Sequence, residues 1–126
     1  MARLLMGLLA LMNLLFLWWV LFNPIDVVEF VGLAAISPTA QVEIRSMYGG
    51  LIGGLGVINL LGAISPKRLG AALWATAWAF AGVGVVRAIS CAVYGIGGWQ
   101  LVFATSEIAA CVTCFWLLSR QPHTEL

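Results

Sequence analysis

Charged residues are scarce in this chain. Only 9% of its 126 residues are Asp, Glu, Lys or Arg, whereas 63% are hydrophobic, and the mean hydropathy is +1.06. A soluble domain carries about 25% charged residues and coats its surface with them. This chain lacks that coat, so we expect its surroundings to be lipid. Its net charge of +1 excludes a nucleic-acid partner, because phosphate binding needs clustered Lys and Arg.

Residues that bind metals or act as nucleophiles are also few. The single histidine, His123, lies in the polar tail, so we predict no metal site. We find no Gly-rich phosphate loop outside an apolar run, and we find no set of nucleophile, base and orienting residue. The sequence therefore predicts no catalytic residues.

Cys111 and Cys114 have the C-x-x-C spacing of redox sites. That spacing indicates redox chemistry when it stands at an exposed helix start, and here it falls in the middle of an apolar run. Cysteine also packs as a small buried hydrophobe. Packing is the favoured interpretation, and a membrane thiol or quinone oxidoreductase is the alternative.

What the chain does have is four apolar runs, each close to the ~20 residues that span a hydrocarbon core. Backbone groups cannot remain unpaired in lipid, so each run should be an α-helix. We predict an all-α integral membrane four-helix bundle with a single domain over residues 1–126. The expected helices cover residues 4–22, 42–64, 69–94 and 99–118.

The first run could be mistaken for a cleaved signal peptide. It is longer than the apolar region of such peptides, carries Trp18 and Trp19 at its far end, and lacks an A-x-A-like cleavage site before Asn23. We therefore expect it to be retained as a helix.

The basic residues predict an orientation. They lie at the amino end, in the connection between the second and third runs, and at the carboxyl end, whereas the first connection is acidic. The positive-inside rule then places both termini in the cytoplasm. The basic residues are Arg3, Lys67, Arg68 and Arg120, and the acidic residues of the first connection are Asp26 and Glu29.

The first connection is too long and apolar for a plain loop. Pro24 suits a first helical position, and Asp26 suits a first turn. We predict a short interfacial helix over about residues 24–36 on the outer surface, ended by Ser37-Pro38.

The few polar residues within the runs fall at a common depth. At 1.5 Å per residue, Arg87 and Glu107 both lie about 10–14 Å below the outer helix ends. Charged groups in a bilayer usually face the interior of a bundle, so this layer predicts an outward-facing pocket. Its candidate members are Arg87, Glu107, Tyr48, Asn13, Glu43 and Arg45.

Two interpretations of the Arg87–Glu107 pair remain open. Buried ion pairs often fix only the register of two helices. Ionisable groups within a membrane also mark ligand sites or proton paths, and the proton version would be a carrier that uses Glu107. Tyr48 has the further interpretation of an interfacial anchor, and Asn13 that of a bridge between helices.

The second run is rich in glycine. Glycines on one helix face allow a neighbouring backbone to approach closely, as small-xxx-small pairs do in membranes. We predict that they form a helix-packing face. The residues are Gly49, Gly50, Gly53, Gly54 and Gly56.

The string Glu43-Ile-Arg45-Ser-Met-Tyr48-Gly49-Gly50, with Asn23-Pro24 before it and Arg87 and Glu107 after it, resembles a family of small bacterial four-helix membrane proteins of unknown function. In general shape that family is similar to DoxX-like proteins. The resemblance covers nearly the whole chain and implies a compact bundle in a bacterial inner membrane. DoxX-like relatives include small subunits associated with quinone-linked oxidations and thiol chemistry, which implies that a quinone or lipid is nearby.

The leading hypothesis is a non-catalytic membrane protein, either an accessory subunit or a binder of an amphipathic lipid or quinone. Arg87 would hold an oxygen of the ligand, Glu107 would orient Arg87, and Tyr48 and Asn13 would add hydrogen bonds. The expected partners are membrane lipid and other membrane subunits.

Overall fold

The structure, a computed structural model, describes residues 1–34 and 37–121, and every regular element in that part of the chain is helical. Four stretches of 21 to 29 residues are long and apolar enough to cross a membrane. The prediction of an all-α four-helix membrane protein is therefore confirmed. The elements are α1 (Ala2–Phe22), α2 (Pro24–Phe30), α3 (Pro38–Ile44), the π-helix η1 (Arg45–Leu51), α4 (Ile52–Ile64), α5 (Pro66–Tyr94) and α6 (Trp99–Ser119).

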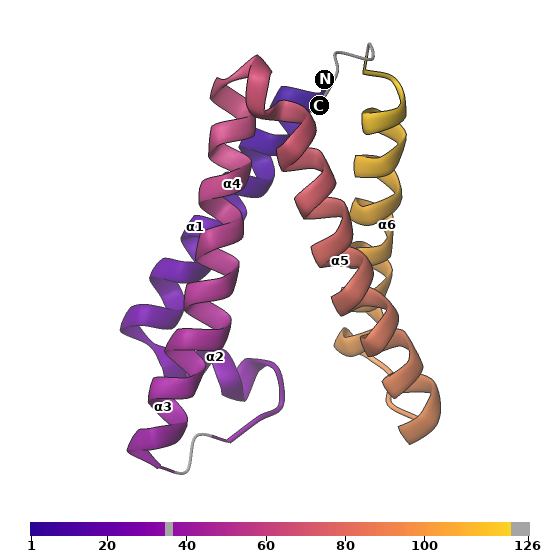
Figure 1. The fold of residues 1–126 in the computed structure, drawn as a ribbon. Helices are drawn as coiled ribbons and strands as arrows, with labels where there is room; N and C mark the ends of the chain where they lie inside the picture. The colour runs from indigo at the N-terminus through magenta and orange to yellow at the C-terminus, as the bar shows by residue number, and fades with distance from the viewer. Residues whose placement is uncertain (35–36, 122–126) are drawn as a thin grey trace.

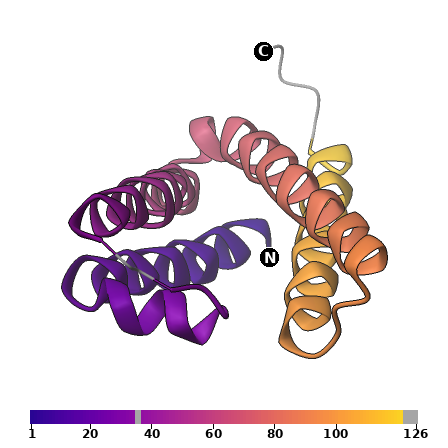
Figure 2. The same cartoon turned by 90° about the horizontal axis from the view of Figure 1, so that it is seen from below.

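The helices form two pairs that diverge. The α3–η1–α4 segment is one continuous rod, Pro38–Ile64, and it packs beside α1, while α5 packs beside α6. The start of α1, the end of α6 and the link between α4 and α5 lie at one end of the molecule, which we call the terminal end (Figure 1). At the opposite end, the loop end, the two pairs stand apart (Figures 1 and 2), and α2 packs against α1.

The positions of the buried side chains explain this shape. In lipid, helices associate through close packing, because the surrounding acyl chains are as apolar as leucine. One buried cluster joins α1, α5 and α6 at the terminal end, and a separate one joins α1, α2 and α3 at the loop end. The first consists of Met6, Ala72, Leu73, Ala77, Cys114 and Leu117, and the second of Val20, Val27, Val28 and Ile44.

The second membrane helix begins earlier than the sequence predicted, at Pro38 and not at about residue 42. Ser37 is its N-cap, and the Ser37 hydroxyl oxygen accepts a hydrogen bond of 3.1 Å from the Ala40 amide. Pro38 occupies the first helical position, where its missing N–H costs nothing. The Ser-Pro pair that was interpreted as the stop of one helix is the start of the next.

The interfacial helix is shorter than predicted. It covers Pro24–Phe30, and not residues 24–36, because Gly32 takes a left-handed conformation with φ of 83° just beyond its end. Glycine adopts that conformation without a steric penalty. The last residues of the predicted helix, 35 and 36, lie outside the described residues, as does His123.

The glycine face of the second membrane helix packs on α1 through three of its five predicted members. A Cβ at Gly49 or Gly56 would come within 3.3 or 3.1 Å of an α1 side chain, and one at Gly53 within 2.6 Å. Gly50 and Gly54 are exposed, and an added Cβ there would meet no other helix. The prediction was wrong for these two glycines, because they lie on the helix face next to the one that contacts α1.

Gly62, which was not among the predicted packing glycines, lies at a close approach between α4 and α5. An added Cβ would lie 2.5 Å from the Ala72 Cβ, an atom fixed directly to the α5 backbone. No rotamer change relieves such a clash, so the two helices would have to separate.

We therefore expect Gly62→Ala to lower the free energy of unfolding by roughly 1–3 kcal/mol, as overpacking does. Gly54→Ala is the matched control on the same helix, and it should leave stability unchanged or slightly raised. Thermal unfolding of both variants in detergent measures the difference. Equal melting temperatures for the two variants would show that α4 and α5 are not held this closely.

Candidate functional site

Arg87 on α5 and Glu107 on α6 form a bidentate ion pair. The Arg87 Nε atom lies 2.9 Å from Glu107 Oε2, and Arg87 Nη2 lies 2.9 Å from Glu107 Oε1. Parallel bonds of this kind are strong and fix geometry. Gly84, buried on α5, makes the pair possible, because a Cβ there would lie 3.1 Å from the Glu107 Cβ. The two helices approach at that point, and the carboxylate lies within reach of the guanidinium.

Gln100 extends the pair into a chain of hydrogen bonds. Arg87 Nη1 donates to Gln100 Oε1 at 2.8 Å, and Gln100 Nε2 donates to the Val31 carbonyl at 3.0 Å. Val31 follows α2, so the chain runs from α5 and α6 across the open loop end to the other half of the molecule. Phe103 covers the Arg87 guanidinium, with 5.7 Å between Cζ and the ring centroid, and its ring centroid lies 6.2 Å from that of Phe30.

A pocket of about 970 Å³ lies beside this chain of hydrogen bonds, between the segment after α2 and the loop-end half of α5. Its wall is mainly apolar, and the exceptions are Arg87, Gln100 and Ser90. Ligand sites usually combine a mostly apolar wall with a few convergent polar groups. The lining residues are Val31, Gly32, Leu33, Trp78, Ala79, Gly82, Val83, Val86, Arg87, Ser90, Cys91, Ile96 and Gln100.

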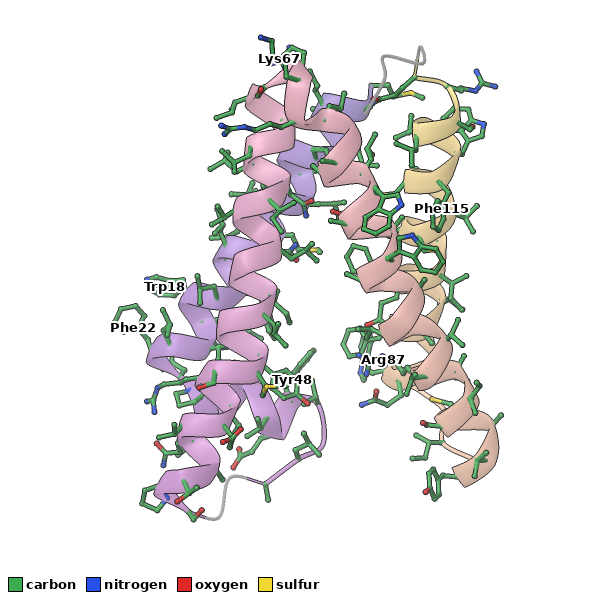
Figure 3. The ribbon with its side chains drawn as sticks, viewed as in Figure 1. Trp18, Phe22, Tyr48, Lys67, Arg87 and Phe115 are labelled. Carbon is green, nitrogen blue, oxygen red and sulfur yellow. The ribbon has the colours of Figure 1, made fainter. Side chains whose placement is uncertain are left out.

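The rest of the predicted polar layer does not join this site. Arg45 Nε donates to the Leu21 carbonyl at 3.2 Å, on the end of α1. Tyr48 packs against the loop-end cluster, and Glu43 is exposed. Tyr48 and Arg87 lie at a similar level on the two helix pairs, as Figure 3 shows. The expectation of one cavity shared by all four helices is therefore wrong. The polar residues of the first two membrane helices do not contact Arg87 or Glu107, because the two helix pairs diverge at this level.

Asn13 belongs to a different environment. It is buried between α1 and the second membrane helix, where a Cβ on Gly56 would lie 3.1 Å from its own Cβ. A second buried polar contact joins α5 to α4, where the Thr76 hydroxyl donates to the Asn59 side-chain oxygen. Among the described residues, the amide nitrogens of Asn13 and Asn59 have no hydrogen-bond partner. These polar residues lie in the helix contacts and do not line the pocket.

The C-x-x-C cysteines also lie away from the pocket. Cys114 is fully buried in the terminal-end cluster, and Cys111 is half-buried on the same helix. The cysteine that does line the pocket is Cys91. Within residues 1–34 and 37–121, no three His, Cys, Asp or Glu side chains gather closely enough to hold a metal ion.

Gln100 in the site, and a π-helix outside the site, escaped prediction. Gln100 lies seven residues before Glu107, on the same helical stripe, and that spacing was a signal that could have added it to the site. The π-helix at Arg45–Leu51 had no periodicity signal, although it contains the Arg-x-x-Tyr-Gly-Gly string on which the resemblance rests. Such π-helical turns are frequent at functional sites.

A sequence model of a protein family, described as a domain of unknown function (DUF4345), matches residues 1–118. The chain belongs to this family. Comparisons with curated proteins and with solved structures found no match. The four candidate spans indicate a multi-pass membrane protein, and the family to which it belongs is one of unknown function.

The ion pair predicts a specific pattern of stability. Removing one partner leaves the other charge uncompensated in the membrane, so Arg87→Met or Glu107→Gln alone should lower the free energy of unfolding by roughly 3–5 kcal/mol, as breaking a buried ion pair does. The double variant should be more stable than either single variant. Thermal unfolding of all three variants in detergent gives the coupling free energy between the two side chains. If the stability losses of the single variants simply add in the double variant, the ion pair contributes nothing to stability.

Proposed function

We propose that this DUF4345 protein is a non-catalytic membrane protein that binds an amphipathic molecule, a lipid or a quinone, in the pocket beside Arg87. The observation that carries the proposal is the composition of the pocket wall. Apolar side chains from Trp78 to Ile96 form most of it, and Arg87 and Gln100 form a polar end. A molecule with an apolar tail and a polar head matches both parts.

The size and placement of the pocket support the same conclusion. Its volume of about 970 Å³ lies at the upper end of the ~300–1,000 Å³ of small-molecule sites. It lies along the outer half of a membrane helix, so a ligand can reach it from the bilayer. The resemblance to DoxX-like proteins that the sequence suggests would favour a lipid or a quinone as the ligand, and an accessory subunit of a membrane assembly is the corresponding cellular role that we propose.

Two other activities have less support. An oxidoreductase using Cys111 and Cys114 would need thiols at a binding site, but Cys114 packs in the terminal-end cluster. A proton carrier would need a free carboxylate, but both oxygens of Glu107 accept hydrogen bonds from Arg87.

The orientation in the membrane belongs to the proposal. Arg3 lies at the terminal end, where its Nε donates to the Ala63 carbonyl at 2.6 Å, and Lys67 projects from the same end (Figure 3). The positive-inside rule then places this end in the cytoplasm and the pocket in the outer half of a bacterial inner membrane.

A glycine in the pocket wall allows a direct test. An added Cβ at Gly82 would have no atom within 4 Å, so Gly82→Phe should place a ring in the pocket and obstruct it without a clash with the backbone. We expect this variant to lose the molecules that co-purify with the wild type after gentle detergent extraction, as measured by mass spectrometry. Gly54→Phe is the matched control, because Gly54 has equally open space on a helix outside the pocket. Retention of the same molecules at the same level by Gly82→Phe would disprove the pocket as their site.

The cysteines provide a second test. The double change Cys111→Ala, Cys114→Ala should leave ligand retention unchanged, because neither thiol lines the pocket. It should lower stability by about 1 kcal/mol, since the Cys114 sulfur is fully buried and its loss leaves a cavity. Mass spectrometry and thermal unfolding on one preparation measure both quantities. Loss of the ligand with an unchanged melting temperature would favour the thiol chemistry.

A further inference from the structure

The pocket has a polar end without net charge. Arg87 is neutralised by Glu107 through two bonds of 2.9 Å, and the pocket wall includes the arginine but not the glutamate. An anion that approached the guanidinium would therefore also approach the carboxylate bound to the same group. In a medium of low dielectric constant that repulsion is poorly screened, and the anion would lose its own hydration without gaining an uncompensated positive charge.

Arg87 and Gln100 are the side chains at this end that keep N–H donors beyond those used within the protein. A guanidinium has five N–H groups, and three of those on Arg87 are used by Glu107 and Gln100. The Gln100 amide donates one of its two N–H groups to Val31, and the Ser90 hydroxyl donates to the Val86 carbonyl at 2.8 Å. The N–H groups left over belong to Arg87 and Gln100. They are available to donate to an acceptor on a ligand.

We infer that the pocket takes an uncharged molecule whose polar end is a carbonyl, as in an ester or a quinone, and discriminates against fatty acids and phosphates. The inference rests on the proposed function and narrows it to one chemical class. The carbonyl oxygen accepts from Arg87 and Gln100, and the apolar part lies along Trp78 and Val83. The ion pair holds the donors in place and removes the charge that would otherwise attract anions.

The test compares three probes on purified protein in detergent and mildly alkaline buffer. Methyl laurate and laurate share a chain and differ in charge, and decylubiquinone is an uncharged quinone. Pocket binding is defined as the binding that Gly82→Phe abolishes, with Gly54→Phe as the control for the added ring. For the wild type we expect methyl laurate to bind at least about tenfold more tightly than laurate, which corresponds to a modest electrostatic penalty.

The variant Glu107→Gln should reverse this order, because it leaves Arg87 with its full positive charge beside the pocket. Laurate should then bind more tightly than methyl laurate. If this variant does not fold, the comparison of methyl laurate with laurate on the wild-type protein is sufficient to test the inference.

Each result has a distinct meaning. Tighter pocket binding of laurate than of methyl laurate by the wild type would overturn the inference while leaving the proposed binding function in place. Absence of any Gly82-dependent binding of all three probes would overturn the proposed function and the inference with it. If uncharged probes are preferred, tighter binding of methyl laurate identifies a lipid ester as the source, and tighter binding of decylubiquinone identifies a quinone.

Discussion

The arrangement of the site depends on the bidentate contact between Arg87 and Glu107. A charge inside a membrane is costly unless it is compensated nearby, and here the compensation comes from the adjacent helix of a single hairpin. Because α5 and α6 satisfy each other's charge, the other two membrane helices need not supply a counter-ion. They are free to diverge at the loop end, and the space beside α5 becomes a pocket.

Packing restricts where that divergence can occur. The buried side chains that hold α5 and α6 to α1 lie at the terminal end, and Gly62 brings α4 and α5 together there. At the loop end, the second buried cluster belongs to α1, α2 and α3. The hydrogen bond from Gln100 to the Val31 carbonyl and the contact between Phe30 and Phe103 connect the halves at that level. The segment after α2 is therefore both a wall of the pocket and a link between the two halves.

The sequence predicted the membrane helices and the pairing of Arg87 with Glu107, because run length and depth depend only on distance along a helix. It predicted the glycine contacts in part, since periodicity assigns Gly49 and Gly53 to a face but does not define how wide the contact is. It did not predict that Asn13 and Arg45 lie apart from the ion pair. Equal depth does not determine the angle between helix pairs, and that angle depends on side chains packed at the opposite end of the molecule.

The neutrality of the ion pair has an electrical consequence. Moving one elementary charge through a potential of 100 mV changes the free energy by about 2.3 kcal/mol, but Arg87 and Glu107 move together as a dipole with no net charge. The voltage across an energised membrane therefore does almost no work on the pair if the two residues shift together across the bilayer. Loading of an uncharged ligand would proceed equally well at any membrane potential, governed by the concentration of that ligand in the bilayer alone.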